Sequence, residues 1–237
     1  MVPTYNEATN IEALLRAVRA ALPDAGILVV DDGSPDGTAD LVEKAATELG
    51  DVHVLRRAEK SGLGSAYRAG FRWGLAAGYD ACVEMDADFS HDPAALPALV
   101  APLEDGYEVV VGSRYVPGGR LDERWSWWRR FLSWWANEVW SRLILGLRTR
   151  DITAGFKCWR RDTLLGIGLE RVKSNGYAFQ VEMTYLSERL GYRIKEIPIY
   201  FEDRRIGQSK MSVPVKLQGA LDVIRIWWRH RDVKRDE

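Results

Sequence analysis

The sequence predicts an α/β fold in which helices cover a mostly parallel sheet. Short apolar runs rich in β-branched residues alternate with amphipathic segments through the first half of the 237-residue chain, which is the pattern of repeated strand–helix units. A run such as 27–30 is continuously apolar, as buried parallel strands are. Polar motifs follow the runs, and ligands of such sheets bind at the carboxyl ends of the strands.

The spacing of apolar residues predicts each element in turn. In the first helix, Ile11, Leu14, Leu15 and Val18 recur at helical intervals before Pro23 ends the pattern. The predicted helices are 6–22, 39–49, 64–77, 93–103, 125–147 and 213–228, the last with basic residues up to 231, and the predicted strands are 27–30, 52–55, 81–85, 108–111 and 195–201. Almost no room remains for a first strand before Pro3, so either that strand is very short or the chain lacks several residues at its start.

Composition excludes several classes of protein. Hydrophobic residues make up 46% and charged residues 28%, an ordinary globular balance, and the net charge of -1 gives no general attraction to nucleic acid. The longest stretch without a charged residue is 93–103, whereas a membrane span needs about 18 apolar residues. We therefore expect neither a transmembrane helix nor a signal peptide. Cys82 and Cys158 form no CxxC pair, which favours a reducing, cytosolic setting over a disulfide framework.

Asp86 and Asp88 are the first candidates for a metal site. They directly follow the apolar run 82–85, and residues i and i+2 of an extended chain point to the same side. Two carboxylates that close repel unless a cation or a proton joins them, and Mg²⁺ or Mn²⁺ takes oxygen ligands and bridges carboxylates to phosphates. For the motif alone, a solvated acidic turn is the alternative. The nearby His91 is interpreted as a loop residue rather than a ligand.

Two other polar segments end predicted strands. A turn explains Asp36, Gly37 and Thr38, but it does not explain adjacent Asp31 and Asp32 at a strand end. One of these two carboxylates is expected to accept hydrogen bonds from a nucleoside. Segment 3–7, Pro-Thr-Tyr-Asn-Glu, lies at the equivalent end of the first strand and offers an aromatic face and a further acceptor. A simple helix start is the alternative for that segment.

Six segments together resemble the polyprenol (dolichol) phosphate mannose synthases, which belong to the family 2 glycosyltransferases. In chain order they are PTYNE, DDGSPDGT, EMDADFSHDP, VVGSRY, DITAGF and DRRIGQSKMS, between residue 3 and about residue 213. The first segment and the DxD pattern indicate only the broader family. DDGSPDGT followed by MDADxSHxP and RxxGxSKMS is much more specific.

The resemblance implies a GT-A (Rossmann-like) nucleotide-sugar-binding fold, GDP-mannose as donor, a polyprenyl phosphate as acceptor, and Mg²⁺ or Mn²⁺. It implies a single domain over 1–237, with a nucleotide-sugar half over 3–115 and an acceptor half over 116–213. The implied donor-binding residues are Pro3, Tyr5, Glu7, Val30, Asp32, Asp86, Ala87, Asp88, Arg204 and Lys210; Asp86 and Asp88 would hold the metal, Arg114, Arg129 and Ser133 the acceptor phosphate, and Asp88 and Arg114 would be catalytic. Some relatives have a metal-binding Gln where this sequence has Ser90.

Charge considerations support these roles independently. Two phosphorylated substrates must meet in one pocket, so several cations are needed to offset their repulsion. The segment around Gly207 carries Arg204, Arg205 and Lys210 and could close over the donor, with a strand-edge role as the alternative. Arg114 could instead be a surface charge. A phosphate monoester is largely anionic at pH 7, so we expect a single inverting displacement without a dedicated catalytic base.

Six of the ten tryptophans lie between Trp125 and Trp140. A helix over 125–147 would combine them with arginines, as helices that lie in the membrane interface do. Packing on the sheet or on a partner subunit is the alternative. We therefore expect peripheral attachment to the cytoplasmic face of the membrane, with Trp227, Trp228 and the following arginines as a second contact, or attachment through a separate anchoring protein.

Two other functions remain open on the sequence. One is a related transferase that uses UDP-glucose or acts on a glycan hydroxyl, which would require a catalytic base. The other is a non-catalytic adaptor that binds a nucleotide sugar and recruits a membrane partner. The intact set Asp86, Asp88, Arg114 and Lys210 weighs against the adaptor.

Overall fold

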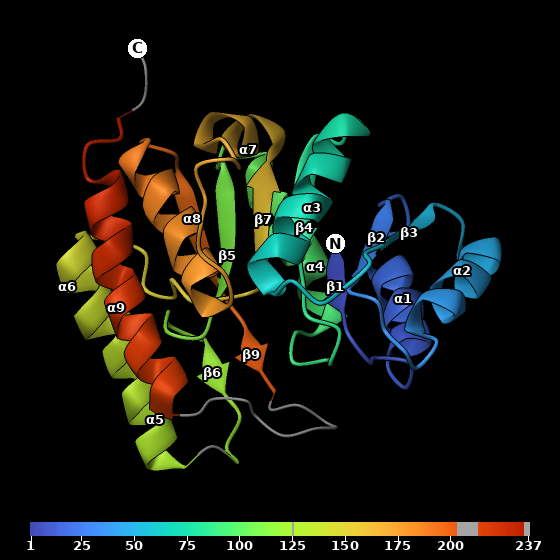
Figure 1. The fold of residues 1–237 in the computed structure, drawn as a ribbon, viewed down its shortest axis with the longest axis horizontal. Coiled ribbons are helices and arrows are strands. Elements are labelled where there is room, and N and C mark those ends of the chain that lie inside the picture. Colours follow the sequence, from blue (N-terminus) through green and yellow to red (C-terminus); the bar gives the residue numbers. More distant parts are fainter. Residues whose placement is uncertain (125, 203–212, 235–237) are drawn as a thin grey trace.

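The computed structural model describes residues 1–124, 126–202 and 213–234 (Figure 1). Two sheets form its centre. Strands β1 (Val2–Thr4), β2 (Ile27–Asp31) and β3 (Val52–Arg56) pair in parallel in that order. The second sheet has the order β4 (Ala81–Glu84), β7 (Lys157–Arg160), β5 (Val109–Ser113) and β8 (Ile194–Pro198). Strands β6 (Arg120–Leu121) and β9 (Tyr200–Phe201) form a small parallel ribbon.

Strand β7 is the antiparallel exception in an otherwise parallel arrangement. It pairs antiparallel with both β4 and β5, while β5 and β8 are parallel. Because β4 and β5 both oppose β7, they run in the same direction and end at the same edge. The α/β prediction with a mostly parallel sheet is confirmed, but β7 was not predicted.

Helices flank the sheets as Figure 1 shows. They are α1 (Ile11–Ala21), α2 (Thr38–Leu49), α3 (Leu63–Ala76), α4 (Leu96–Val100), α5 (Trp127–Trp134), α6 (Arg142–Leu145), α7 (Arg161–Ile167), α8 (Tyr177–Arg189) and α9 (Val213–His230). A π-helical stretch, Trp135–Ser141, joins α5 to α6, so most of the predicted helix over 125–147 is helical. None of the described helices is both long enough and apolar enough to cross a bilayer.

One helix prediction was wrong in its start, and another was wrong in the regularity of the helix. The first helix begins at Ile11 rather than at residue 6, because Asn6 has a positive φ of 62° and the Glu7 carbonyl accepts the first helical N–H groups. The predicted helix 93–103 consists of α4 between two short 3₁₀ turns, Pro93–Ala95 and Ala101–Leu103. Its prolines have no N–H to donate, which breaks the regular ladder.

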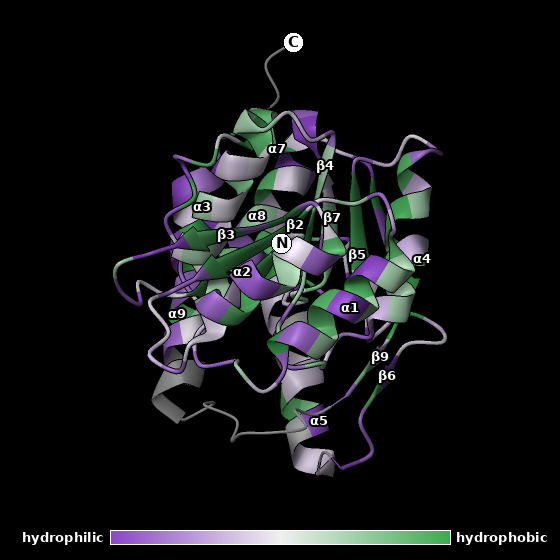
Figure 2. Ribbon diagram, turned by 90° about the vertical axis from the view of Figure 1, so that its right-hand side faces the viewer, coloured by the Kyte–Doolittle hydropathy of each residue, from purple (hydrophilic) through white to green (hydrophobic). Residues whose placement is uncertain are grey.

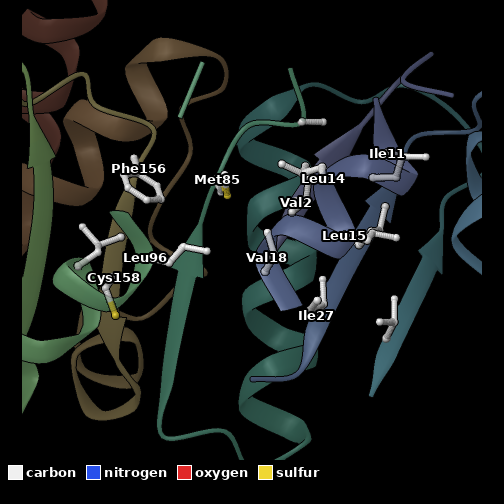
Figure 3. Close-up of a cluster of buried hydrophobic side chains, with 14 of the residues drawn as sticks. Val2, Ile11, Leu14, Leu15, Val18, Ile27, Met85, Leu96, Phe156 and Cys158 are labelled. Atoms are coloured by element: carbon white, nitrogen blue, oxygen red, sulfur yellow. The ribbon is translucent and has the colours of Figure 1, made fainter. Parts of the chain in front are cut away.

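One core joins the two sheets. Val2, Ile11, Leu14 and Ile27, from the first sheet and α1, share a buried cluster with Cys158 on β7, with Leu96 on α4, and with Met85 and Phe156 beside β4 and β7 (Figure 3). In Figure 2 the strands are hydrophobic and the surrounding loops largely hydrophilic. The apolar core thus fixes the ends of β1, β2 and β4 relative to one another, and the polar motifs follow those ends.

A buried polar network joins β4, β7 and α8. The Glu84 carboxylate accepts hydrogen bonds from Trp159 Nε1 at 3.2 Å and from Gln180 Nε2 at 3.0 Å. Lys157 Nζ, opposite Glu84 in the ladder, donates to Gln180 Oε1 and Thr184 Oγ1, each at 3.0 Å. Burial raises the pKa of Glu84 and lowers the pKa of Lys157, while their mutual attraction opposes both changes. This network fixes the strand that leads into Asp86.

Glu182 connects α8 to α9. Its carboxylate is fully buried and accepts hydrogen bonds from Arg229 Nη1 and His230 Nε2, both at 2.7 Å, and from the backbone N–H groups of Lys173 and Ser174. Burial opposes the charge, but the hydrogen bonds from His230, Ser174 and Arg229 outweigh it and lower the pKa of Glu182 to about 2.

We predict that Glu182→Gln flattens the acid dependence of stability. Because the pKa of Glu182 is lowered from 4.5 to about 2 on folding, its contribution is complete above pH 5 and is lost as the pH falls towards 2. The contribution is about 3 kcal/mol, of which about 2 kcal/mol should be lost between pH 7 and pH 3. Urea unfolding at both pH values measures this. The exposed Glu170→Gln is the control, and equal acid losses in wild type and Glu182→Gln would contradict the assignment.

Candidate active site

The loop after β4 holds the two aspartates of the DxD motif. Ser90 donates from its backbone N–H and its hydroxyl to Asp88 Oδ1, at 3.1 and 2.6 Å. Phe89 has a positive φ of 59°, so the chain turns sharply between Asp88 and Ser90. The Asp88 side chain is largely buried, whereas the Asp86 side chain is 32% exposed. Ser90 therefore orients the Asp88 carboxylate.

The surroundings of Asp86 fit a hard divalent cation. A Cβ atom added to Gly155 would make ordinary van der Waals contact with both carboxylate oxygens of Asp86, at 3.8 Å, so Gly155 lines the space beside this carboxylate. The Tyr67 hydroxyl is fully buried near Asp86 but does not form a hydrogen bond of ordinary geometry with any described residue. Burial and the Asp86 and Glu84 carboxylates raise the pKa of Tyr67, so this hydroxyl remains a donor.

Protein ligands alone would not complete a metal site there. Among the described residues, no three His, Cys, Asp or Glu side chains are grouped to hold a metal ion. A cation bound by Asp86 and Asp88 would take further oxygen ligands from a diphosphate or from water, as Mg²⁺ commonly does.

His91 is a buried neighbour of Asp86. Its ring stacks on Phe156 with centroids 5.0 Å apart, and Nδ1 accepts the backbone N–H of Asp86 at 3.2 Å. Burial lowers the pKa of His91 to about 4, so the imidazole is neutral at pH 7 and carries its proton on Nε2. The sequence predicted that His91 is a loop residue. In the structure it lies in the loop, but it is also buried and accepts the Asp86 backbone N–H.

The two aspartates at the end of β2 have different surroundings. Asp31 is buried and accepts hydrogen bonds from Thr4 Oγ1 at 2.9 Å and from Ser34 Oγ at 2.6 Å, which holds the turn. Asp32 Oδ1 accepts a hydrogen bond from Arg57 Nη1 at 2.7 Å, and Arg57 also reaches Ser65. Burial raises the pKa of Asp32, an effect that Arg57 partly offsets. Sequence reasoning did not include Arg57 among the site residues.

The end of β1 lies beside this turn. Tyr5 is 37% exposed, and Lys60 Nζ lies 3.8 Å above its ring. Glu7 accepts a hydrogen bond from Asn10 Nδ2, and its backbone N–H donates to Thr38 Oγ1. Asp32 N–H donates to the Thr4 carbonyl, which connects the two strand ends. Tyr5, Glu7 and Asp32 therefore lie at one edge.

The remaining donor-binding candidates near these strands are apolar. Pro3 is half-buried and lies opposite Val30 in the β1–β2 ladder. The Val30 side chain is fully buried against Ala66, and Ala87 is buried between the two aspartates. Contact of Pro3, Val30 and Ala87 with a nucleotide stays a prediction.

Arg114 forms a buried ion pair. Its Nε and Nη2 atoms donate to the two oxygens of Asp151 at 2.7 and 2.6 Å, and Nη2 also reaches Thr153 Oγ1. Burial opposes the Arg114 charge, but Asp151 outweighs it and raises the pKa of Arg114. The guanidinium lies 5.3 Å from the Phe201 ring, which also contacts His91. Arg114 is therefore not an ordinary surface charge, and it shares Phe201 with the DxD loop.

Asp151 was missed as an individual residue, although the DITAGF segment was singled out. Its backbone N–H donates to Glu196, and its side chain is fully buried. An acidic residue close to a glycine is typical of a turn, so the sequence provided no reason to single out Asp151. Its pairing with Arg114 is visible only in the structure. The family resemblance indicated the DITAGF segment, but not the pairing of Asp151 with Arg114.

The acceptor-phosphate candidates lie on or near α5. Ser133 Oγ is 2.7 Å from the hydroxyl of Tyr115, the residue after Arg114. This hydrogen bond joins α5 to the VVGSRY segment, and the role of Ser133 in acceptor binding stays a prediction. The Arg129 side chain, and Arg204 and Lys210 entirely, lie outside the part of the chain that the structure describes.

A family model described as glycosyl transferase family 2 matches residues 1–161, so the chain belongs to that family and is a glycosyltransferase. More specific relatives confirm the resemblance. The chain is 48% identical over 225 residues to an undecaprenyl-phosphate mannosyltransferase from Micrococcus luteus, covering 95% of this chain and 91% of that protein. It is 47% identical over 213 residues to a polyprenol monophosphomannose synthase from Mycolicibacterium smegmatis, covering 90% and 80%.

Solved structures confirm the GT-A fold. A glucosyl-3-phosphoglycerate synthase from Mycobacterium tuberculosis, in complex with Mn²⁺, UDP and glucosyl-3-phosphoglycerate, aligns with a TM-score of 0.64 at 22% identity. The alignment covers 96% of this chain and 77% of that chain. The complex of the same enzyme with Mn²⁺, UDP and phosphoglyceric acid gives 0.65 at 21%, covering 96% and 76%. At this identity the likeness defines the fold alone.

We predict that Asp151→Asn destabilises the protein by about 3 kcal/mol, because it leaves a buried guanidinium without its counter-charge. Urea unfolding at pH 7 measures the loss. Asp105→Asn changes an exposed carboxylate and is the control. A loss below about 1 kcal/mol for Asp151→Asn would show that the ion pair contributes little to stability.

Proposed function

We propose that the chain transfers mannose from GDP-mannose to a polyprenyl phosphate with the help of a divalent cation. The observation that carries this proposal is the DxD loop, in which Ser90 orients Asp88 and His91 holds the backbone of Asp86 at the carboxyl end of β4. The two relatives named for mannosyl transfer to lipid phosphates support the sugar and the acceptor class.

The donor would bind across the edges of both sheets. Asp32, next to Arg57, offers hydrogen-bonding groups for the nucleoside, and Tyr5 offers an aromatic face. With the nucleoside at Asp32, the diphosphate of the donor would lie beside Asp86 and Asp88. A cation held by these two carboxylates would supply stabilisation of the charge on the leaving diphosphate.

The acceptor would approach from the side of α5. Arg114 lies between this helix and the DxD loop, since Ser133 bonds to Tyr115 and Phe201 contacts both Arg114 and His91. Its pairing with Asp151 fixes the guanidinium beside the position proposed for the acceptor phosphate.

The reaction would be a single displacement with inversion. A phosphate oxygen of the acceptor forms a bond to the anomeric carbon while the bond from that carbon to the nucleoside diphosphate breaks. The attacking oxygen is already anionic at pH 7, so no proton has to be removed by the protein. The task of the protein residues is alignment and charge compensation.

We predict that Asp88→Asn lowers mannosyl transfer at least about 100-fold while the fold is retained, because the loss falls on stabilisation of the leaving group. Incubation with radiolabelled GDP-mannose or UDP-glucose, polyprenyl phosphate and Mg²⁺ or Mn²⁺, followed by organic extraction, measures product. Asp105→Asn is the matched control. Label in the organic phase from UDP-glucose alone would contradict the proposed donor, and full activity of Asp88→Asn would contradict the metal assignment.

The proposal includes a membrane-facing surface, defined here as the exposed apolar side chains of α5 and α9. Trp127 and Trp128 on α5 are 74% and 52% exposed, and Leu221 and Trp228 on α9 are 52% and 61% exposed. Helix α9 packs along α6 and the π-helical stretch that continue α5 (Figure 1). Arg231 lies 4.0 Å above the Trp228 ring, a combination suited to a layer of anionic headgroups.

We predict that the double variant Trp127→Glu and Trp228→Glu lowers binding to vesicles of phosphatidylcholine and phosphatidylglycerol about tenfold or more, because two interfacial anchors become charged. Flotation of protein with the vesicles measures binding. Leu165→Glu on α7, also an exposed apolar residue, is the control. Unchanged flotation of the double variant would remove this surface from the proposal.

A further inference from the structure

His91 lies between three parts of the active site. Its Nδ1 atom accepts the Asp86 backbone N–H at 3.2 Å, and its ring stacks on Phe156 at an interplanar angle of 13°. The ring also meets Phe201 in an edge-to-face arrangement, with centroids 5.5 Å apart. Phe156 ends the DITAGF segment, and Phe201 ends β9.

The loop is attached to β9 by its backbone as well. His91 and Phe201 form an isolated antiparallel bridge, and the Glu202 N–H donates to the Ser90 carbonyl at 3.3 Å. Phe201 in turn lies 5.3 Å from the Arg114 guanidinium. A displacement of the His91 ring would therefore change the Asp86 backbone and the Phe201 side chain together.

We propose that His91 is a positioning residue that fixes the Asp86 carboxylate for cation binding through its Nδ1 hydrogen bond to the Asp86 backbone. The inference rests on the proposed metal site at Asp86 and Asp88. His91 is not a ligand in this account, because its Nδ1 lone pair already accepts the backbone N–H. Its effect resembles that of outer-shell partners of metal ligands, whose removal typically costs 10- to 100-fold in metal affinity.

Two substitutions separate the hydrogen bond from the ring packing. His91→Phe keeps the aromatic packing against Phe156 but removes the acceptor. His91→Asn loses the ring but places an amide oxygen where Nδ1 lies. The acceptor account predicts weaker cation binding for His91→Phe, whereas a purely packing role predicts weaker binding for His91→Asn.

The experiment is a titration of each protein with Mn²⁺ in the presence of GDP, with free Mn²⁺ followed by its paramagnetic resonance signal. The dissociation constant should rise about tenfold or more for His91→Phe and stay within about threefold of wild type for His91→Asn. Thermal melting checks the fold, and His91→Asn is expected to melt lower because the ring packing is lost.

Each alternative outcome has a distinct meaning. Wild-type affinity in His91→Phe, or an equal loss in both variants, overturns the positioning role while leaving the metal site intact. Failure of wild-type protein to bind Mn²⁺ with GDP overturns the proposed metal site itself. If His91→Phe does not fold, His91→Gln replaces it, because the Gln amide oxygen reaches the position of Nε2 rather than that of Nδ1. The His91→Gln variant should bind Mn²⁺ about tenfold more weakly than His91→Asn. Equal affinities of these two variants would overturn the positioning role.

Discussion

The buried polar network between β4, β7 and α8 is the constraint on which the site depends. Glu84 and Lys157 lie opposite each other in the β4–β7 ladder and share Gln180 as a hydrogen-bond partner. Neither charge is exposed to water, so each requires the partners that the other elements supply. With β7 held between them, β4 and β5 end at one edge, and the Asp86 loop and Arg114 follow those ends. A shift in the β4–β7 register would separate them.

At that edge the protein arranges charge before any substrate binds. Asp88 is oriented by Ser90, Arg114 is fixed by Asp151, and Asp32 is paired with Arg57. Each pairing reduces the reorganisation that would otherwise accompany the approach of two anionic substrates. The Asp86 carboxylate is partly exposed, and the Asp86 backbone N–H is held by His91.

The sequence predicted the first half of the fold well because strands there are apolar and helices amphipathic. It did not predict β7 or α8. Strand β7 contains a buried lysine, and α8 buries Gln180, Glu182 and Thr184 together with apolar residues, so neither shows the expected periodicity. For the site, motifs after strands indicated Asp32, Asp86 and Asp88 as candidates, and the family resemblance indicated Arg114. Partners such as Asp151 and Arg57 are set by tertiary contacts and could not be inferred from spacing.

The central claim is that Asp86 and Asp88 hold a cation that binds the diphosphate of a nucleotide sugar. Calorimetric titration of the wild-type protein with GDP-mannose, in Mn²⁺ and again in excess EDTA, tests it most directly. The account predicts binding at least about tenfold tighter with Mn²⁺, because the cation supplies the main attraction for the diphosphate. Equal affinity under the two conditions, or no binding in either, would contradict it.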